Sequence, residues 1–184
     1  MNAPDTAAET LARWQADEAA IRARATLPPQ PLRLQDVAGR SALEAFHAML
    51  RGEAPPAPIG VTMDFILVDA APGFAVFQGR PLPKHYNPMG TVHGGWFATL
   101  LDSALGCAVA AALPAGKAYT TLELKVNIVR ALTDKVPLVR AEGRTVHVGG
   151  QTATAEARLL GPDGKLYAHA STTCLVFDAR PAKA

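Results

Sequence analysis

The sequence predicts an α+β protein in which an antiparallel six-stranded sheet wraps around one long central helix. An almost uninterrupted apolar run at residues 96–113 is long enough to form that helix. Two segments with strand character precede this run and four follow it. Short turns join the later segments, which favours antiparallel pairing. One helix packed on one such sheet gives a two-layer α+β architecture.

The composition is that of a globular protein and excludes several function classes. The 184 residues are 49% hydrophobic and 18% charged, which suits one domain with a short extension. The net charge is only +2 and the Lys and Arg residues are scattered, so we expect no nucleic-acid partner and no transcriptional role. The N-terminal residues lack a basic start followed by an apolar core, so we expect no signal peptide and a cytoplasmic location.

The N-terminal part forms an arm outside the main domain. Residues 1–26 are rich in Ala and in charged residues, with Leu11, Trp14 and Ile21 at helical spacing. This pattern indicates a weak amphipathic helix or a loose arm. Several prolines then end any helix and start an extended linker. The chain therefore has an arm with its linker, a main domain and a C-terminal tail, at residues 1–38, 39–178 and 179–184.

A short helix is predicted at residues 41–50, near the start of the main domain. Ser41 can cap this helix, and Glu44 three residues later completes a capping box. The helix has one apolar face, formed by Phe46, Met49 and Leu50. A second Pro-rich break follows at residues 52–58.

Six strand segments are separated by turn signals. They lie at residues 61–70, 74–81, 119–130, 136–148, 152–161 and 165–177. Gly and Pro clusters predict three hairpin turns, at Ala71-Pro72-Gly73, Gly149-Gly150 and Gly161-Pro162-Asp163-Gly164. In the third segment apolar and polar residues alternate, as in a half-buried antiparallel strand. The apolar face of that strand is predicted to carry Leu122, Leu124, Val126 and Ile128.

The apolar run is better explained by a buried core helix than by a membrane span. At about 1.5 Å per residue its 18 residues would reach roughly 27 Å. However, Asp102 lies in the middle, and no Lys or Arg flanks set an orientation. Because the run is apolar nearly all round, the sheet must wrap it or a second subunit must cover the rest. Cys107 and Cys174 are expected to be buried free thiols, and without a C-x-x-C pair we expect no metal site.

Asp102 is the residue that points to function. A lone carboxylate amid apolar surface must be paired, hydrogen-bonded or raised in pKa. His93, Gly94 and Gly95 lie just before the helix, where glycines let a ligand approach free N–H groups. This combination indicates a site built on a helix. Two plainer explanations stay open: Asp102 only hydrogen-bonds the backbone or Ser103, or the glycines only cap or pack the helix.

A resemblance to a known family covers about residues 40–178. The chain contains a stretch that resembles the central segment of hotdog-fold thioesterases of the phenylacetate-degradation (PaaI-type) group. This stretch is HYNPMGTVHGGWFATLLDSALGCAVAA. The family motif is matched at Asn87, His93, Gly94, Gly95 and Asp102. Three later segments resemble the remaining strands of that group in order, namely AYTTLELKVNIVRAL, AEGRTVHVGGQTATAEARL and GKLYAHASTTCLVF. The resemblance implies a homodimer with one continuous sheet, commonly paired into a homotetramer, that hydrolyses acyl-CoA thioesters.

The resemblance also implies two catalytic parts. Asp102 would be the general base or the nucleophile, and the Gly94 and Gly95 N–H groups would bind the oxyanion; thioester hydrolysis needs both. Asp102 lies eight residues after Gly94, roughly 12 Å along a helix, which is too far for one carbonyl to touch both. The resemblance implies that the helix start of one subunit faces Asp102 of the partner subunit. No cofactor is expected, because coenzyme A is part of the substrate.

Three further residues would support catalysis. His93 could orient the oxyanion loop or donate to the thioester. The resemblance implies that Asn87 positions water or the acyl group and that Thr121 touches the carboxylate or the water. The plainer alternatives are a structural histidine at a helix start and an asparagine in a turn before Pro88.

Substrate-binding candidates lie in turns and near the helix start. The Gly149-Gly150 turn falls where the family binds coenzyme A, although Gln151 stands here instead of the cation that many relatives carry near this point. Arg130 is available for the phosphates, with surface solvation as its plainer explanation. Two bulky residues are candidates to line the acyl pocket, Trp96 and Met89. A tryptophan there suggests a medium-chain or aryl acyl group, with plain core packing as the favoured alternative.

Two other functions are compatible with this fold class. A hydratase or dehydratase of acyl thioesters would use a histidine together with the Asp, but no His follows Asp102 within the helix. A non-catalytic acyl-CoA binding module would not need the carboxylate. The missing His therefore disfavours the hydratase, and the intact Asp102 disfavours the binding module.

Overall fold

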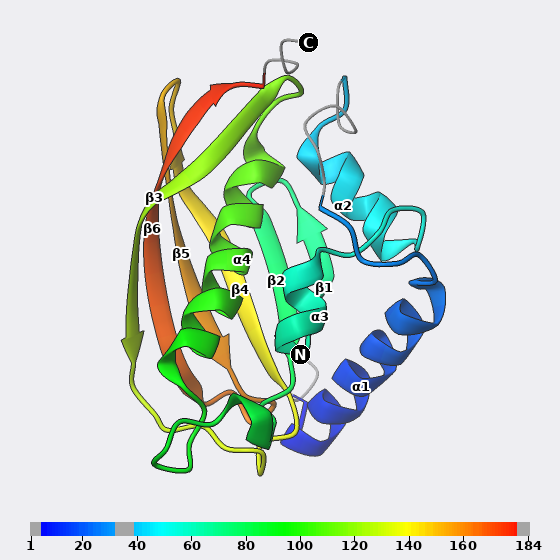
Figure 1. Cartoon of the computed structure of the whole chain (residues 1–184), viewed down its shortest axis with the longest axis vertical. Coiled ribbons are helices and arrows are strands. Elements are labelled where there is room, and N and C mark those ends of the chain that lie inside the picture. The colour runs from blue at the N-terminus through cyan, green and yellow to red at the C-terminus, as the bar shows by residue number, and fades with distance from the viewer. Residues whose placement is uncertain (1–4, 32–38, 180–184) are drawn as a thin grey trace.

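The computed structural model describes residues 5–31 and 39–179, and it confirms the predicted α+β fold. A curved sheet wraps around the long helix α4, and the other helices lie on the side of β1 (Figure 1). The helices are α1 (Ala7–Arg24), α2 (Ala42–Leu50), α3 (Pro58–Met63) and α4 (Gly94–Ala112), with a 3-10 helix at Pro83–His85. The strands are β1 (Phe65–Ala71), β2 (Phe74–Gly79), β3 (Lys117–Ile128), β4 (Val139–Val148), β5 (Thr152–Leu160) and β6 (Leu166–Asp178).

The six strands form one sheet in the order β1-β2-β4-β5-β6-β3, and every neighbouring pair is antiparallel. The edges of the sheet are therefore β1 and β3. The predicted glycine turns join β1 to β2, β4 to β5 and β5 to β6. β3 follows α4 in the chain but pairs with the last strand, with Lys117 opposite Asp178 and Ile128 opposite Ala168. β1 and β2, which precede α4 in the chain, therefore lie at one edge of the sheet, and β3, which follows α4, forms the other edge.

The first strand begins later than the sequence predicts. Residues 61–63 belong to α3, and β1 starts at Phe65. Pro58 lies in the first turn of α3, where its ring suits the helical φ and its missing N–H costs no hydrogen bond. Asp64 ends the helix in the left-handed conformation, with φ of 52°. A helix this short depends on packing against its neighbours, so the β-branched residues near its end wrongly indicated a strand.

The alternation predicted for β3 is wrong at Leu122. The pairing with β6 shifts register between Thr121 and Glu123, which marks a bulge. A bulge adds one residue to a strand and so reverses the side-chain alternation beyond it. Leu122 is 61% exposed, whereas Leu124 and Val126 pack against the core as predicted. The bulge lets Thr121 and the later apolar residues face the same side.

α4 forms the centre of the hydrophobic core. It has four large side chains with no exposed surface, Leu100, Leu101, Leu105 and Val109. By length and composition alone α4 is long and apolar enough to cross a membrane, but 61% of that window is buried inside the protein, and a core helix passes the same test. Cys107 and Cys174 are free thiols, as predicted.

Close contact between α4 and the sheet depends on one glycine in β4. A Cβ atom at Gly143 would lie 2.2 Å from the carbonyl oxygen of Ala104 in α4. Because the obstacle is backbone rather than a flexible side chain, no side chain fits between strand and helix here. This contact sets the depth of α4 in the sheet, and with it the position of Asp102.

The N-terminal residues form a docked helix. Trp14 and Glu18 of α1 are buried, and the Gln78 side chain on β2 donates to the Trp14 carbonyl oxygen at 3.1 Å and to the Glu18 carboxylate at 3.0 Å. Arg80 also donates to Glu18, at 2.9 Å. Arg140 of β4 donates to Gln78 at 2.8 Å and lies 4.7 Å above the Trp14 ring. A buried carboxylate persists only with such partners, so these contacts tie α1 to the sheet.

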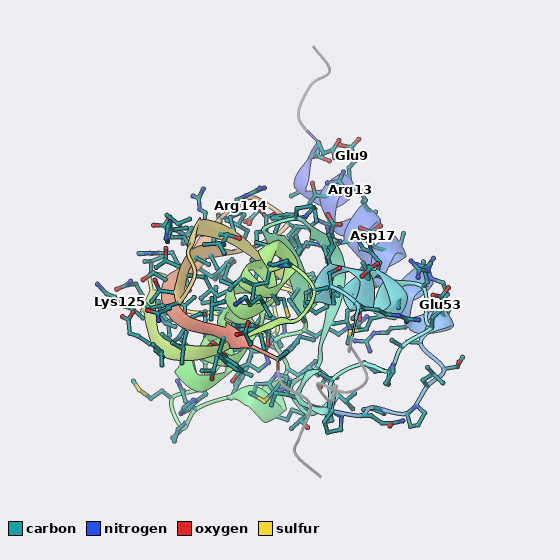
Figure 2. All side chains as sticks on the ribbon, turned by 90° about the horizontal axis from the view of Figure 1, so that it is seen from above. Glu9, Arg13, Asp17, Glu53, Lys125 and Arg144 are labelled. Carbon is teal, nitrogen blue, oxygen red and sulfur yellow. The ribbon has the colours of Figure 1, made fainter. Side chains whose placement is uncertain are left out.

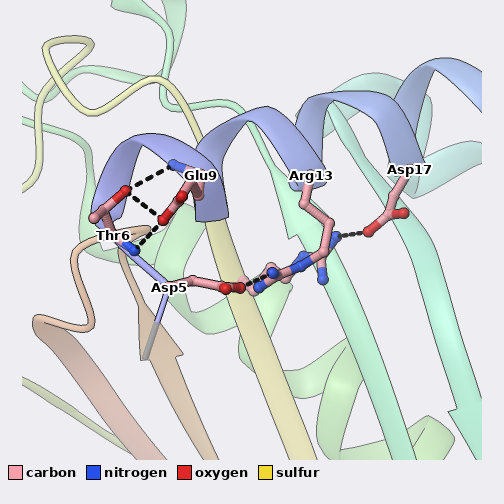
Figure 3. Close-up of polar contacts among 6 residues, drawn as sticks. Asp5, Thr6, Glu9, Arg13 and Asp17 are labelled. Atoms are coloured by element: carbon pink, nitrogen blue, oxygen red, sulfur yellow. Dashed lines mark hydrogen bonds and ion pairs between the residues drawn. The ribbon is translucent and has the colours of Figure 1, made fainter. Parts of the chain in front are cut away.

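The start of α1 and the surface of the sheet carry the exposed charges. Thr6 and Glu9 form a reciprocal capping box, and Arg13 pairs with Asp5 (Figure 3). Lys125 and Arg144 extend outward from the strands, away from α1 and α2 (Figure 2). These charges are solvated, and the opposite face of the sheet encloses α4.

Candidate functional site

Asp102 lies midway along α4 and is half-buried. Its Oδ1 atom accepts a hydrogen bond of 3.2 Å from the Thr121 hydroxyl on β3. Ser103 is not its partner, because the Ser103 hydroxyl donates to the Thr99 carbonyl oxygen at 2.9 Å. Burial raises the pKa of Asp102, and the Thr121 hydrogen bond opposes part of that rise. The structure thus brings two of the predicted catalytic residues together.

The start of α4 is capped by the histidine that precedes it. The Gly95 N–H donates to Nδ1 of His93 at 2.8 Å, and the Trp96 N–H donates to the His93 carbonyl oxygen at 3.0 Å. Within the described residues no acceptor pairs with the Gly94 N–H. Of the two glycine N–H groups proposed as oxyanion donors, the one on Gly94 is therefore open to a ligand.

His93 combines a capping role with a free ring edge. Because Nδ1 accepts the Gly95 hydrogen bond, the ring carries its proton on Nε2. The side chain is exposed, so Nε2 is available as a donor beside the helix start. This arrangement agrees with the structural alternative for His93 and leaves one donor for a ligand.

Asn87 organises the loop before α4. Its Oδ1 atom accepts from the Met89 N–H at 2.9 Å and from the Thr91 N–H at 3.3 Å, and its Nδ2 atom donates to the Thr91 hydroxyl at 3.0 Å. These bonds close a tight turn, as asparagine side chains often do. Met89 lies in that turn and is 88% exposed. In one subunit, then, Asn87 holds the loop and the Met89 side chain faces solvent.

Trp96 is a core residue. It is almost fully buried, stacks on His85 with ring centroids 5.5 Å apart, and donates from Nε1 to the Met63 carbonyl oxygen at 2.8 Å. These contacts satisfy both the ring and its N–H group. The structure therefore does not place Trp96 in an acyl pocket.

The glycine turn predicted to bind coenzyme A lies apart from the helix start. Gly149 donates to the Thr152 carbonyl oxygen at 2.8 Å within the β4–β5 turn, and Gly150 is exposed beside it. This turn lies at the end of the sheet near the C-terminal end of α4, whereas Gly94 begins the helix at the other end (Figure 1). Arg130 follows β3 and is exposed. It comes two residues after Ile128, whose side chain would lie 3.3 Å from a Cβ atom at Gly94, so within one subunit only the glycine turn is remote from the helix start.

A cavity of about 550 Å³ opens beside Asp102. It is lined by Asp102, Ser103 and Cys107 of α4 and by Tyr119 of β3. The rest of the wall is mostly apolar, with Arg22 and Asp64 as its charged residues, and comes from α1, α2, α3, β1, β2 and the segments between these elements. Ligand pockets in proteins are typically about 300–1,000 Å³ and mostly apolar with few polar groups. The cavity matches that description.

The other ionisable groups beside Asp102 stay protonated near neutral pH. Burial raises the pKa of Cys107 to about 12, and the nearby Asp102 charge adds to that effect. Burial likewise raises the pKa of Tyr119 well above its ordinary value. A thiol with so high a pKa is a poor nucleophile. On the α4 and β3 side of the cavity, Asp102 is thus the group suited to act as a base.

The cavity-lining residues were missed from the sequence. One signal was present: Thr99, Ser103 and Cys107 recur at intervals of four along an otherwise apolar helix, which marks the face that the sheet does not cover. No such signal existed for the wall built by α1 and α2. Those helices come from other parts of the chain, and only the tertiary fold places them opposite Asp102.

Comparison with known proteins identifies the family. A family model described as the thioesterase superfamily matches residues 89–168. A phenylacetic acid degradation-related protein from Ralstonia eutropha is 30% identical with a TM-score of 0.64, covering 71% of this chain and 98% of that chain. A variant of the phenylacetic acid degradation protein PaaI from Thermus thermophilus is 28% identical with a TM-score of 0.58, covering 64% and 97%. A search of curated proteins gives no match.

More distant structures share the fold. The PaaI protein of E. coli is 19% identical with a TM-score of 0.63, and the match covers 74% of this chain and 93% of that chain. The similarity to the Ralstonia protein spans nearly all of that relative, and the sheet and helix described above are the parts these proteins share. The chain therefore belongs to the thioesterase superfamily, as a PaaI-like protein with the hotdog fold.

Proposed function

We propose that the protein is an acyl-CoA thioesterase in which Asp102 activates the attacking water. The observation that carries this proposal is the half-buried carboxylate of Asp102, which is hydrogen-bonded to Thr121 on the wall of a mostly apolar cavity of ligand size. The family membership supports a thioester as the substrate, and the cavity supports a medium-chain or aryl acyl group. We expect the protein to act in the cytoplasm without a cofactor.

The proposed reaction needs two groups of this chain. A water molecule attacks the thioester carbon and gives its proton to Asp102. The carbonyl oxygen becomes an oxyanion, which the Gly94 N–H and the positive end of α4 stabilise. The C–S bond then breaks, and the coenzyme A thiolate leaves and takes the proton from Asp102, which restores the carboxylate. A pKa raised by burial makes Asp102 a stronger base while it is ionised. Asp102 acting as a nucleophile would give the same products through an anhydride.

We propose that the complete site forms between two copies of the chain. Gly94 and Asp102 lie too far apart on one straight helix to contact the same carbonyl. β3 is an edge strand of the sheet and exposes Leu122 and Ile128, apolar residues that a second copy would cover. Pairing of two β3 edges would extend the sheet and set the α4 helices of both copies side by side. This supports a homodimer, which can pair further into a tetramer.

A panel of thioesters tests the proposed function. Purified protein is mixed with short-, medium- and long-chain acyl-CoAs and with aryl-CoAs such as phenylacetyl-CoA, and release of the free thiol is recorded. We expect turnover of at least one class, with free acid as the second product by mass spectrometry. Addition of water across an acyl double bond, without release of thiol, would indicate the hydratase instead. Binding without turnover would indicate the binding module.

Thr121→Val is expected to shift the pH dependence of hydrolysis. The Thr121 hydroxyl donates to Asp102 and so opposes the rise of its pKa; valine keeps the shape and removes the donor. The pKa of Asp102 then rises further. Because the base must be ionised, the limb on which kcat/KM increases with pH moves to higher pH. Profiles for wild type and variant check this, with the exposed neighbour Thr120→Val as the control that leaves the limb in place.

A further inference from the structure

We propose that the N-terminal arm, α1 together with residues 25–31, forms the outer wall of the acyl pocket and limits the length of the acyl chain. This inference rests on the proposed function, since it takes the acyl group of the thioester as the occupant of the cavity beside Asp102. It assigns a role in specificity to a part of the chain outside the matched family region, residues 89–168.

The arm supplies part of the cavity wall directly. Ile21 comes from the last turns of α1, and Leu27 and Pro29 come from the extended stretch that follows. Phe46 and Met49 of α2 belong to the same wall. An acyl group with its carbonyl at Asp102 would therefore extend into an apolar space enclosed partly by the arm.

The arm is held in place by polar contacts with the sheet and with the segment before α3. Burial acts to raise the pKa of Glu18, but hydrogen bonds from Arg80 and Arg22 outweigh it and the pKa is lowered. Asp17 adds an ion pair of 2.7 Å with Arg140 on β4. Beyond α1, the Gln30 N–H donates to the Pro56 carbonyl oxygen at 3.1 Å. Both ends of the wall segment are thus anchored, which suits a fixed boundary for a ligand.

The rim of the cavity carries exposed apolar side chains. Leu27, Ile59 and Val61 all line the cavity, and all three are exposed. Leu27 comes from the arm and the other two come from α3, yet they meet at one opening. Apolar residues gathered around a pocket are typical of a binding site whose ligand covers them. This second observation indicates an apolar occupant, as an acyl chain would be.

The relatives compared above match only part of this chain. The Ralstonia protein matches over 98% of its own length but covers only 71% of this chain. The fold around α4 does not require the extra residues, because the relatives form it without a match to the whole chain. The arm, which lies outside residues 89–168, contributes here to the cavity wall and to contacts with β2 and β4.

Substitutions at Leu27 test the inference in two directions. Leu27→Ala should lengthen the pocket and move the preferred chain length upward, whereas Leu27→Trp should fill it and move the preference to shorter chains. Because Leu27 is partly exposed, neither change is expected to unfold the protein. Straight-chain acyl-CoAs from butyryl to lauroyl serve as substrates. Each methylene added or removed near the wall should change the relative kcat/KM by about tenfold or more. Leu11→Ala, on α1 but outside the cavity, is the matched control with an unchanged profile.

A binding measurement separates this inference from the proposed function. Thioether analogues, in which CH2 replaces the thioester carbonyl, bind but are not hydrolysed, and calorimetry gives their Kd against chain length. If the wild type hydrolyses acyl-CoAs and both Leu27 variants keep the wild-type length profile, the arm has no such role and the hydrolase stands. If no thioester is hydrolysed but the Leu27 variants shift the Kd profile as stated, the pocket wall stands and the hydrolase does not. A Kd without dependence on chain length overturns the inference.

Discussion

Replacing Asp102 with Asn is expected to lower kcat for acyl-CoA hydrolysis by about 10²–10⁴, the usual contribution of a general base. The amide keeps the size of the side chain and can still accept the Thr121 hydrogen bond, but it takes no proton from water. Burying the charged carboxylate beside the apolar cavity costs free energy, which is why the pKa of Asp102 is raised. The neutral amide avoids this cost. The variant should therefore fold at least as well as the wild type.

Steady-state kinetics and binding check this expectation together. Asp102→Asn should lose kcat while retaining the affinity for a thioether analogue, because the acyl wall is unchanged. Asp69→Asn, an exposed carboxylate on β1 outside the cavity, is the control that keeps full activity. Full activity in Asp102→Asn would remove this residue from the mechanism, whatever the substrate.

Gly94→Pro is expected to lower kcat by about 10²–10³, because it removes the N–H proposed to bind the oxyanion. Proline suits this position: Gly94 is the first residue of α4, where no helical hydrogen bond is lost. His93 before it has ψ of 139°, the extended conformation that a residue before proline prefers. The substitution thus deletes one donor and preserves the helix.

Gly94→Ala is the matched control for the loss of the donor. It adds a Cβ atom but keeps the N–H, and that Cβ would lie 3.3 Å from the flexible end of Ile128. We expect Gly94→Ala to keep most of the activity that Gly94→Pro loses, as measured by kcat with KM recorded alongside. Equal losses in both variants would mean that the space at Gly94, and not its N–H group, is what matters.

Mixing the two inactive variants shows whether the site is shared. If Gly94 of one subunit serves Asp102 of the other, a mixed dimer of Asp102→Asn and Gly94→Pro contains one intact site and one doubly altered site. Random mixing after unfolding and refolding should then restore about a quarter of wild-type activity, since a closed two-fold dimer repeats the same contact twice. No recovery, in dimers shown to exchange subunits, would place both groups in one subunit.

The sequence allowed the fold to be predicted because its signals were local. The apolar run, the glycine turns and the strand patterns each occupy a few neighbouring residues, and together they predicted the sheet that the structure shows. The errors arose where packing overrides local pattern. Residues 61–63 form a helix against β1 although they look like a strand, and the bulge in β3 exposes Leu122. Neither a tertiary contact nor a bulge can be read from residue order alone.

The candidate site was predictable in part for the same reason. Asp102 was recognisable because a charge is conspicuous in an apolar helix, and its contact with Thr121 followed from the family pattern. The role of Gly95 was not, since whether its N–H is free depends on the rotamer of His93. Trp96 looked like a pocket residue, but its neighbours His85 and Met63 hold it in the core.

The sequence by itself determined the secondary structure around α4 and singled out Asp102 as the candidate catalytic carboxylate. Only the tertiary structure decided what encloses that carboxylate. The wall opposite Asp102 comes from α1 and α2, which lie far from it in the chain and dock through scattered contacts such as that of Glu18 with Gln78. Burial and cavity shape depend on contacts between residues that are distant in the sequence, so they exist only once the chain has folded.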